Sequence, residues 1–315
     1  MTDSRTHAPE AAPDVETAAA TVRQVIDNVE QVIVGHHDEI EHVIVAMLAG
    51  GHVLLEDVPG VGKTMLARAV AASVDGSFNR VQFTPDLLPA DVTGADVYNQ
   101  GTGEFAFHEG PIFANVVLAD EINRAPPKTQ SALLESMAEQ QVSTDGTTHD
   151  VPTPFTVIAT QNTVEQDRTY DLPLAERDRF MSKLQLGYPD ADEEVAMLDR
   201  IVGRHPIEDI SPVVTLEEFR SARDVAASIT VERPIQEYVT DLATYTREHA
   251  QLGASPRASL SLLRAAQARA LRSGRGYVTP DDVQAEIGVV WPHRIRSEQP
   301  PDELVSRAVD SVPVV

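Results

Sequence analysis

The 315-residue chain contains no cysteine and no long apolar run. Without cysteine it cannot form disulfides, thiolate zinc sites or a cysteine nucleophile. No apolar segment reaches the ~18 residues that a membrane-spanning helix needs. Residues 1–20 also lack the basic and apolar regions of a secretory signal. We therefore expect a cytoplasmic protein that does not insert into a membrane.

Positive charge is also scarce. The chain has 49 acidic and 25 basic residues, for a net charge of −24, and lysine occurs only at Lys63, Lys128 and Lys183. An acidic surface repels phosphate backbones and anionic lipids, so general nucleic-acid or membrane binding is disfavoured, although a local basic pore is compatible with this composition. The same composition is typical of proteins from a salty cytoplasm, where a Debye length of about 3 Å at 1 M screens self-repulsion. It also fits an ordinary acidic protein, and both interpretations stay open.

A glycine-rich stretch follows a short apolar run. Residues 53–64 read Val-Leu-Leu-Glu-Asp-Val-Pro-Gly-Val-Gly-Lys-Thr, and a helical pattern begins directly afterwards. This order of strand, glycine loop and helix is that of a phosphate-binding P-loop, in which Lys63 reaches the β- and γ-phosphates and the Thr64 hydroxyl binds Mg²⁺. Asp57 stands where the consensus has its first glycine. The alternative interpretation is a glycine-rich turn before a helix.

A second apolar run ends in two carboxylates. Residues 115–121 read Asn-Val-Val-Leu-Ala-Asp-Glu, which predicts a buried parallel strand ending where open α/β sheets bind their ligands. At this distance from a P-loop the pattern indicates a Walker B motif. Asp120 is then expected to hold Mg²⁺, and Glu121 to orient the attacking water. In isolation, an acidic turn after a core strand is the alternative.

Further polar side chains follow later strands. The apolar run at residues 155–160 leads to Asn162, whose amide can contact a γ-phosphate or the attacking water, or simply cap a turn. Residues 172–180 predict a short helix that carries Arg177 and Arg179. The alternating residues 183–186 predict an edge strand. His36 and His37 diverge on a helix, and we interpret His37 and Glu41 as an exposed pair rather than a metal site.

The pattern of the whole chain predicts two domains. An α/β domain covers residues 21–187, includes amphipathic helices before the P-loop and contains a hairpin at about 95–108. A helical domain covers residues 188–296, with helices expected at 193–202, 216–227, 234–249, 257–272 and 280–289. Residues 1–20 and 297–315 are polar and proline-containing, so we expect a disordered acidic tail at the first end and a flexible tail at the second.

These motifs together resemble those of the AAA+ ATPases, and within them the MoxR family. The similarity spans roughly residues 22–296, and its densest segments are Val32 to Gly35, Gly50 to Thr64, Gln82 to Pro89 and Asp120 to Lys128. One departure is His36, where the family commonly has glutamine. The resemblance implies an α/β fold with a five-stranded parallel sheet flanked by helices, plus an all-helical lid, with nucleotide bound at their junction.

The resemblance also implies roles for individual residues. Asn162 corresponds to sensor 1, Arg257 to the sensor 2 arginine at the start of a lid helix, and Arg179 to the arginine finger, with Arg177 as the rival. The hairpin at 95–108 corresponds to an insert that faces the pore of a ring. The residues expected to bind ATP are Val34, Gly35, Asp57, Val58, Pro59, Gly60, Val61, Gly62, Lys63, Thr64 and Met65.

Three functions are compatible with these motifs. The first is the one that the resemblance implies: a hexameric, Mg²⁺-dependent ATPase that remodels client complexes like a chaperone, often with a partner containing a von Willebrand factor A domain. The second is the ATPase subunit of a metal-chelatase-like machine, which carries the same motifs. The third is a nucleic-acid motor, which the acidic charge and the lack of a basic binding module disfavour.

Overall fold

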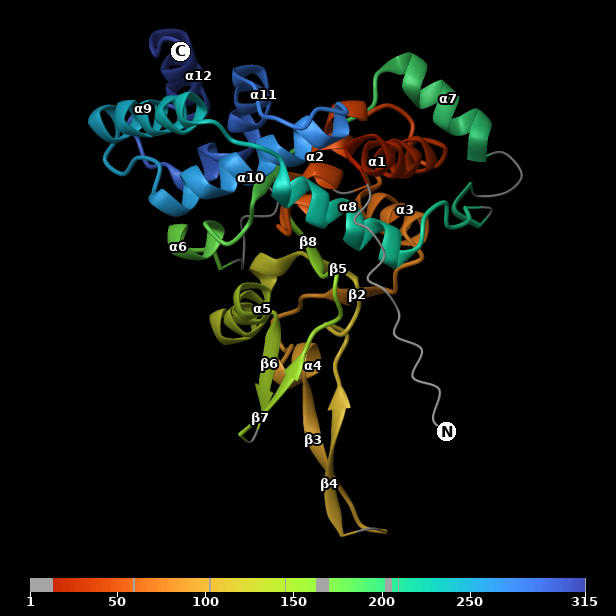
Figure 1. Cartoon of the computed structure of the whole chain (residues 1–315). Helices are drawn as coiled ribbons and strands as arrows, with labels where there is room; N and C mark the ends of the chain where they lie inside the picture. The colour runs from red at the N-terminus through yellow and green to blue at the C-terminus, as the bar shows by residue number, and fades with distance from the viewer. Residues whose placement is uncertain are drawn as a thin grey trace, which may run out of the picture.

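A computed structural model describes residues 14–58, 60–101, 103–144, 146–162, 170–201, 206–208 and 210–314. Figure 1 shows a group of helices above a β-sheet and two hairpins that extend below it. None of the helices in these ranges is both long and apolar enough to cross a membrane.

The centre of the α/β domain is a five-stranded parallel sheet with the order β2-β5-β8-β1-β9. Its strands are β1 (Val53–Asp57), β2 (Phe78–Gln82), β5 (Val116–Asp120), β8 (Thr156–Asn162) and β9 (Ser182–Leu184). The central strands are apolar because both of their faces are covered. Val53 and Leu55 pack into one core, and Leu54 packs into the other. The predicted fold class is confirmed, and β9 is the predicted edge strand.

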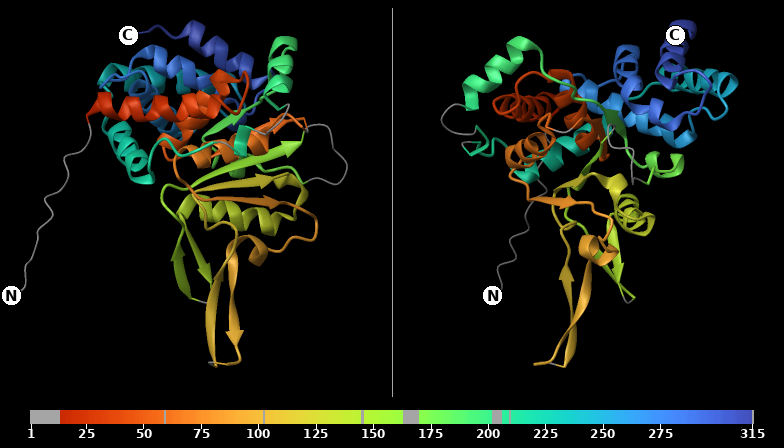
Figure 2. Two further views of the ribbon diagram at one scale, coloured as in Figure 1. Left: turned by 90° about the vertical axis from the view of Figure 1, so that its right-hand side faces the viewer. Right: turned by 180° about the vertical axis from the view of Figure 1, so that it is seen from behind.

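Helices cover both faces of this sheet (Figure 2). The helices α1 (Val15–Glu30), α2 (His37–Leu48) and α3 (Lys63–Ser73) share the first core with the helical domain. The helix α5 (Pro127–Glu139) and the short α4 (Pro89–Thr93) cover the other face, where Leu133, Leu134 and Met137 are buried. Because the central strands are parallel, their carboxyl ends lie at one edge of the sheet between these two layers of helices.

Two antiparallel hairpins leave the sheet (Figure 1). The strands β3 (Gly94–Asn99) and β4 (Glu104–Glu109) form the predicted hairpin, on which Tyr98 and Phe105 are exposed with ring centroids 5.2 Å apart. The second hairpin, β6 (Gln141–Thr144) with β7 (Thr147–Asp150), was not predicted. The sequence Asp145-Gly146 between two alternating segments is its signal, because that dipeptide favours the tight turns of hairpins.

The helical domain contains the five predicted helices. They are α7 (Ala191–Ile201), α8 (Leu216–Ser228), α9 (Arg233–His249), α10 (Pro256–Arg272) and α11 (Pro280–Val290). The short elements are η1 (Ile122–Arg124), α6 (Leu174–Arg177), η2 (Pro206–Glu208) and η3 (Pro292–Arg294). Because α1 and α2 pack against α8 and α10, the helical domain shares a continuous core with the sheet.

Both predicted tails contain helix. Helix α1 begins at Val15, where the Asp14 carboxylate caps the Thr17 amide at 2.8 Å, and Ala18 and Ala19 are buried. The rest of the predicted first tail, residues 1–13, lies outside the described residues. The prediction of a flexible tail at 297–315 was wrong, because α12 (Pro301–Ser311) packs against α9 and α11. Its buried apolar residues recur with helical spacing that the surrounding polar residues obscured: Leu304, Val305 and Ala308.

The predicted pair between His37 and Glu41 forms, with 2.9 Å between Nε2 and Oε1. It was wrongly expected to be exposed on both sides, because Glu41 is buried and also contacts Arg269 and Arg272. Those two guanidinium groups neutralise the Glu41 carboxylate, so Glu41 serves as an ion-pair partner between α2 and α10.

Candidate nucleotide-binding site

A pocket opens at the carboxyl ends of the central strands, where the P-loop leaves β1 for α3. The residues that line it are Gly60, Gly62, Lys63, Thr64, Arg80, Gln82, Asp120, Glu121 and Asn162. The predicted Walker A lysine and threonine, both Walker B carboxylates and the predicted sensor asparagine are therefore brought together in one cavity.

The P-loop backbone turns at two glycines. Gly60 and Gly62 both have φ of +89°, in the left-handed region where a side chain would be strained. Gly62 precedes the first residue of α3, and no side chain caps that helix, so its first amide groups can bind an anion. The Lys63 ammonium donates to the Val58 carbonyl oxygen at 3.1 Å across the loop. Pro59 lies outside the described residues.

Asp57 does not line the pocket, although we predicted that it contacts nucleotide. It is 5% exposed, and its Oδ1 accepts from the Val58 amide at 2.8 Å. Its Oδ2 accepts from the amides of Leu186 and Gly187 at 2.7 and 3.0 Å. The departure from the P-loop consensus therefore has a structural reason: Asp57 joins the end of β1 to the chain that follows β9. Val61 and Met65, also predicted to bind nucleotide, are half-buried beside the lining residues.

Thr160 links the two Walker B residues. Its hydroxyl donates to Asp120 Oδ1 at 2.7 Å and accepts from the Glu121 backbone amide at 2.8 Å. Glu121 itself has a φ of +55°, so the chain turns sharply directly after β5. Sequence reasoning treated Thr160 only as the end of an apolar strand. Its role depends on the parallel pairing of β8 with β5, which brings their carboxyl ends to the same edge of the sheet.

The end of β2 supplies two more polar groups that sequence reasoning missed. The Arg80 guanidinium donates to Asp120 Oδ2 at 2.6 Å, and the Gln82 amide donates to Glu121 Oε2 at 2.6 Å. Arg124 also donates to Glu121 Oε2, at 2.8 Å. Both Walker B carboxylates are thus oriented by side chains of the same subunit.

The oxygen donors in this pocket fit a hard divalent cation. The Thr64 hydroxyl and the Asp120 carboxylate face the same cavity, and Mg²⁺ prefers oxygen ligands and keeps several waters. Arg80 pairs with Asp120 Oδ2, and its side chain is 48% exposed. A side chain this exposed can move aside at little cost, so the residues present fit the metal.

Two parts of the chain match models of known protein families. Residues 52–182 match the model described as ATPase family associated with various cellular activities (AAA), and residues 242–313 match the AAA lid domain. Chaperone MoxR1 of Mycobacterium tuberculosis is 41% identical over 310 residues, which cover 93% of this chain and 82% of that protein. The chain belongs to the MoxR family of AAA+ ATPases.

Other similar proteins agree with this assignment to the MoxR family. Protein MoxR of Methylorubrum extorquens is 32% identical over 301 residues, covering 85% of both chains. Uncharacterized protein YeaC of Bacillus subtilis is 49% identical over 274 residues, covering 86% of both chains. The solved structure of a candidate ATPase from Cytophaga hutchinsonii is 36% identical, with a TM-score of 0.89 over 96% of this chain and 97% of that one.

The arginines that the MoxR resemblance singled out lie outside this pocket. Arg179 Nη1 donates to the Leu134 carbonyl oxygen of α5 at 2.5 Å. Neither Arg179 nor Arg177 lines the nucleotide pocket of its own subunit. Arg257, predicted as sensor 2, is 61% exposed and lies 3.9 Å from the Asp178 carboxylate. The segment around Asp178 and the first turn of α10 are therefore neighbours.

The lid holds this segment through a second arginine. Arg294 in η3 is buried and donates to the Phe180 carbonyl oxygen at 2.7 Å, and its Nε lies 3.3 Å from the Asp178 carboxylate. Burial lowers the pKa of Arg294 to about 10, against the opposing effect of Asp178. His293 Nε2 lies 3.0 Å from the same Phe180 oxygen. A movement of the lid would therefore move the residues on either side of Asp178.

The remaining predicted nucleotide contacts lie before α2. Val34 and Gly35 follow α1, and Gly35 has a φ of +71°. A Cβ at Gly35 would lie 2.4 Å from a carboxylate oxygen of Glu193 in α7. Gly35 is thus favoured by its backbone angle, and the Glu193 carboxylate would have to shift to make room for a side chain there. Neither Val34 nor Gly35 lines the pocket of the Walker motifs.

Proposed function

We propose that this MoxR-family chain is a Mg²⁺-dependent ATPase that uses ATP binding and hydrolysis to assemble or remodel client protein complexes. The observation that carries the ATPase proposal is the convergence of Lys63, Thr64, Asp120, Glu121 and Asn162 on one pocket. These residues come from three separate strand ends, and such a set is what phosphoryl transfer to water requires.

Each residue in this set has a proposed role. The amides around Gly60 and Gly62 cradle the phosphates, and Lys63 binds the β- and γ-phosphate oxygens. Glu121 accepts a hydrogen bond from the attacking water and aligns it with the γ-phosphorus. Asn162 donates its amide to the γ-phosphate or to that water. Catalysis in this scheme is positioning together with electrostatic stabilisation.

The Thr64 hydroxyl and the Asp120 carboxylate would hold the metal. When bound, Mg²⁺ neutralises charge on the β- and γ-phosphates of the nucleotide. Thr160 keeps the Asp120 carboxylate in its orientation through the hydrogen bond to Oδ1. A cation held by Asp120 would require the Arg80 side chain, which pairs with Oδ2 and lines the same pocket, to move aside.

We also propose that the chain forms a ring, with six subunits as the expected number. The MoxR resemblance supports this, and so does an arginine-bearing segment that lies outside its own nucleotide pocket. The exposed Tyr98 and Phe105 on the β3–β4 hairpin offer an aromatic surface for a client. A protein with a von Willebrand factor A domain is the expected partner, because the family resemblance implies it.

The ATPase proposal is tested by steady-state ATP hydrolysis and nucleotide binding. We expect Lys63→Ala to weaken ATP binding, because it removes the cation at the β- and γ-phosphates. Glu121→Gln should bind ATP normally and hydrolyse it very slowly, because the amide cannot polarise water. Hydrolysis by Glu121→Gln at the wild-type rate would refute the proposed site.

The client is best sought with the same variant. Glu121→Gln loaded with ATP should hold the ring in its client-binding state and enrich specific proteins in an affinity purification. Lys63→Ala serves as the matched control, since it should not form that state. Identical proteins recovered with both variants would contradict an ATP-driven remodelling cycle while leaving the ATPase assignment intact.

A further inference from the structure

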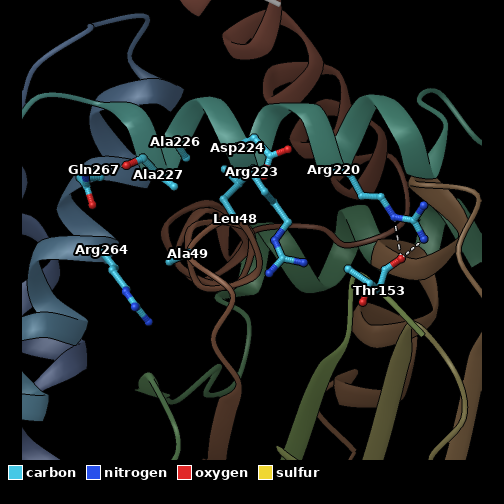
Figure 3. Close-up of a pocket in the computed structure, with 10 residues that line it drawn as sticks. All are labelled: Leu48, Ala49, Thr153, Arg220, Arg223, Asp224, Ala226, Ala227, Arg264 and Gln267. Atoms are coloured by element: carbon cyan, nitrogen blue, oxygen red, sulfur yellow. Dashed lines mark hydrogen bonds between the residues drawn. The ribbon is translucent and has the colours of Figure 1, made fainter. Parts of the chain in front are cut away.

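A second cavity, of about 510 Å³, lies between the helical domain and the α/β domain. Figure 3 shows side chains from α8 and α10 extending toward the turn after α2 and the loop before β8. The lining residues are Leu48, Ala49, Thr153, Arg220, Arg223, Asp224, Ala226, Ala227, Arg264 and Gln267. This cavity is distinct from the nucleotide pocket and has no role in the function proposed above.

Three arginines line this cavity in a chain whose net charge is −24. Arg220 is held in place, because its Nε donates to the Thr153 carbonyl oxygen at 2.7 Å and its Nη1 lies 3.4 Å from Glu217. Arg223 and Arg264 have neither a hydrogen bond nor an ion pair within the described ranges of the chain. Their guanidinium groups extend into the same cavity (Figure 3).

Little on the protein neutralises this positive charge. Among the described lining residues, Asp224 alone carries a carboxylate, and in Figure 3 that carboxylate points away from the Arg223 guanidinium. Burial lowers the pKa of Arg223, and the neighbouring Arg220 lowers it further against the opposing charge of Asp224. Like charges that share a partly buried cavity repel one another unless an anion is bound between them.

The backbone beside Arg223 accommodates its guanidinium closely. Gly50, in the turn after α2, has a φ of +72°, and a Cβ there would lie 2.7 Å from Arg223 Nη2. Arg223 is not needed to satisfy the end of α2, since the carbonyls of Val45, Ala46 and Met47 already accept from the following amides. The Arg223 guanidinium thus lies against the Gly50 backbone without a hydrogen-bond or ion-pair partner among the described residues.

We propose that this cavity binds a small, multiply charged oxyanion of the phosphate type between the arginines of α8 and α10. Guanidinium groups bind phosphate oxygens with two parallel hydrogen bonds. A tetrahedral phosphate offers oxygens in several directions at once, so it can bind arginines from two different helices. A single planar carboxylate can form parallel hydrogen bonds with only one guanidinium group. The cavity volume falls within the ~300–1,000 Å³ of small-molecule sites.

The proposed anion site and the nucleotide pocket lie at opposite ends of the same strands. Gly50 and Thr153 precede β1 and β8, whereas the P-loop follows the carboxyl end of β1 and Asn162 ends β8. The five residues of β1 span roughly 17 Å at about 3.3 Å per residue. An anion held between α8 and α10 would therefore restrain these two helices without contacting ATP.

The test is isothermal titration calorimetry with inorganic pyrophosphate at constant ionic strength. The full-length Lys63→Ala protein is the parent, so that the P-loop does not bind the probe. We expect saturable binding that Arg223→Gln and Arg264→Gln each weaken by about tenfold or more, since each removes a charge-assisted contact. Arg223→Lys should bind with intermediate affinity, because lysine keeps the positive charge but lacks the two parallel N–H donors of a guanidinium group.

Arg233→Gln is the matched control, because its side chain is 86% exposed on α9 and removing it changes the net charge equally. It should bind pyrophosphate like the parent. Arg264 is exposed, so its variant is expected to fold even if substitution of the half-buried Arg223 lowers stability. The absence of saturable binding, or equal affinity in the parent and both arginine variants, would overturn the proposal. Arginine-dependent binding of polyglutamate but not of pyrophosphate would overturn it too, and would assign the cavity to an acidic protein segment.

Discussion

The carboxylate of Asp57 accepts a hydrogen bond from the backbone amide of Leu186 at 2.7 Å. The first residue belongs to the end of β1, where the P-loop begins, and the second lies just after β9. A glycine at position 57, as in the P-loop consensus, would remove this hydrogen bond and leave only the strand pairing of β1 with β9. The acidic residue thus couples the position of the P-loop to the edge of the sheet that continues toward the helical domain.

We predict that Asp57→Gly, which restores the consensus, lowers the free energy of unfolding by about 2–3 kcal/mol. The substitution leaves the buried amide of Leu186 and the half-buried amide of Gly187 without their acceptor, and an unsatisfied buried donor costs about 1–3 kcal/mol. Asp57→Asn keeps one acceptor oxygen and should lose less. Urea denaturation monitored by circular dichroism measures both. Unchanged stability of Asp57→Gly would show that water replaces the carboxylate at no cost.

A second prediction concerns Thr160, which orients Asp120 and Glu121 without lying in the pocket itself. Thr160→Val keeps the shape and removes the hydroxyl, so we expect about 10–100-fold lower kcat and a higher Mg²⁺ requirement, as for other residues that orient metal ligands. The KM for ATP should change little, because the P-loop is intact. Thr160→Ser should restore most of the activity. A loss of thermal stability with normal kcat would instead indicate a purely structural role.

The Walker residues and the sheet could be predicted from the sequence because they depend on local patterns. Apolar strands ending in polar side chains, with glycines before a helix, specify both the fold and the site. Arg80 and Thr160 could not be identified this way, because their roles depend on which strands are neighbours in the sheet. Helix α12 was missed for a related reason: its three apolar side chains can be recognised as core residues only when it is known that α9 and α11 pack against them.

Stability should depend on pH through His52. This buried side chain accepts from the Val157 amide at Nδ1 and donates to the Met137 carbonyl oxygen from Nε2, so it is held neutral. Burial lowers its pKa from 6.5 to about 4. Between these values the unfolded chain binds more protons than the folded one, so stability falls as pH decreases from 6.5 toward 4, and His52 adds no pH dependence above that window.

His52 is expected to lower the free energy of unfolding by about 3 kcal/mol at pH 4 relative to neutral pH, because one unit of pKa shift corresponds to about 1.4 kcal/mol. Carboxylates titrate in the same range, so the measurement is the difference in slope between wild type and His52→Asn across pH 4 to 7. Asparagine retains an acceptor for the Val157 amide. The exposed His249 provides the control substitution, which should leave the slope unchanged. Equal slopes for wild type and His52→Asn would contradict this assignment.

The last prediction is that a neighbouring subunit completes the active site. Arg179 lies outside its own nucleotide pocket and close to α5, in a segment that resembles the arginine-finger region of the family. An arginine supplied from another subunit contributes about 10³–10⁵-fold to the rate in well-studied P-loop enzymes. Arg179→Ala should therefore bind ATP nearly normally and hydrolyse it very slowly. The alternative is that Arg179 only holds α6 against α5, in which case Arg177 is the remaining candidate.

Mixed rings separate these possibilities. Arg179→Ala and Lys63→Ala subunits are each expected to be inactive alone, but a mixed ring would place an intact P-loop beside an intact arginine. Such rings should recover part of the wild-type hydrolysis rate. A second mixture, of Arg179→Ala with Arg177→Ala, tests whether both arginines are needed in the same subunit. Native mass spectrometry verifies that mixed rings form. Verified mixed rings that hydrolyse ATP no faster than the two parent variants would show that Arg179 does not act across the interface, because an essential arginine acting on the neighbouring site must restore turnover there. Full activity of Arg179→Ala alone would show that Arg179 is not needed for hydrolysis.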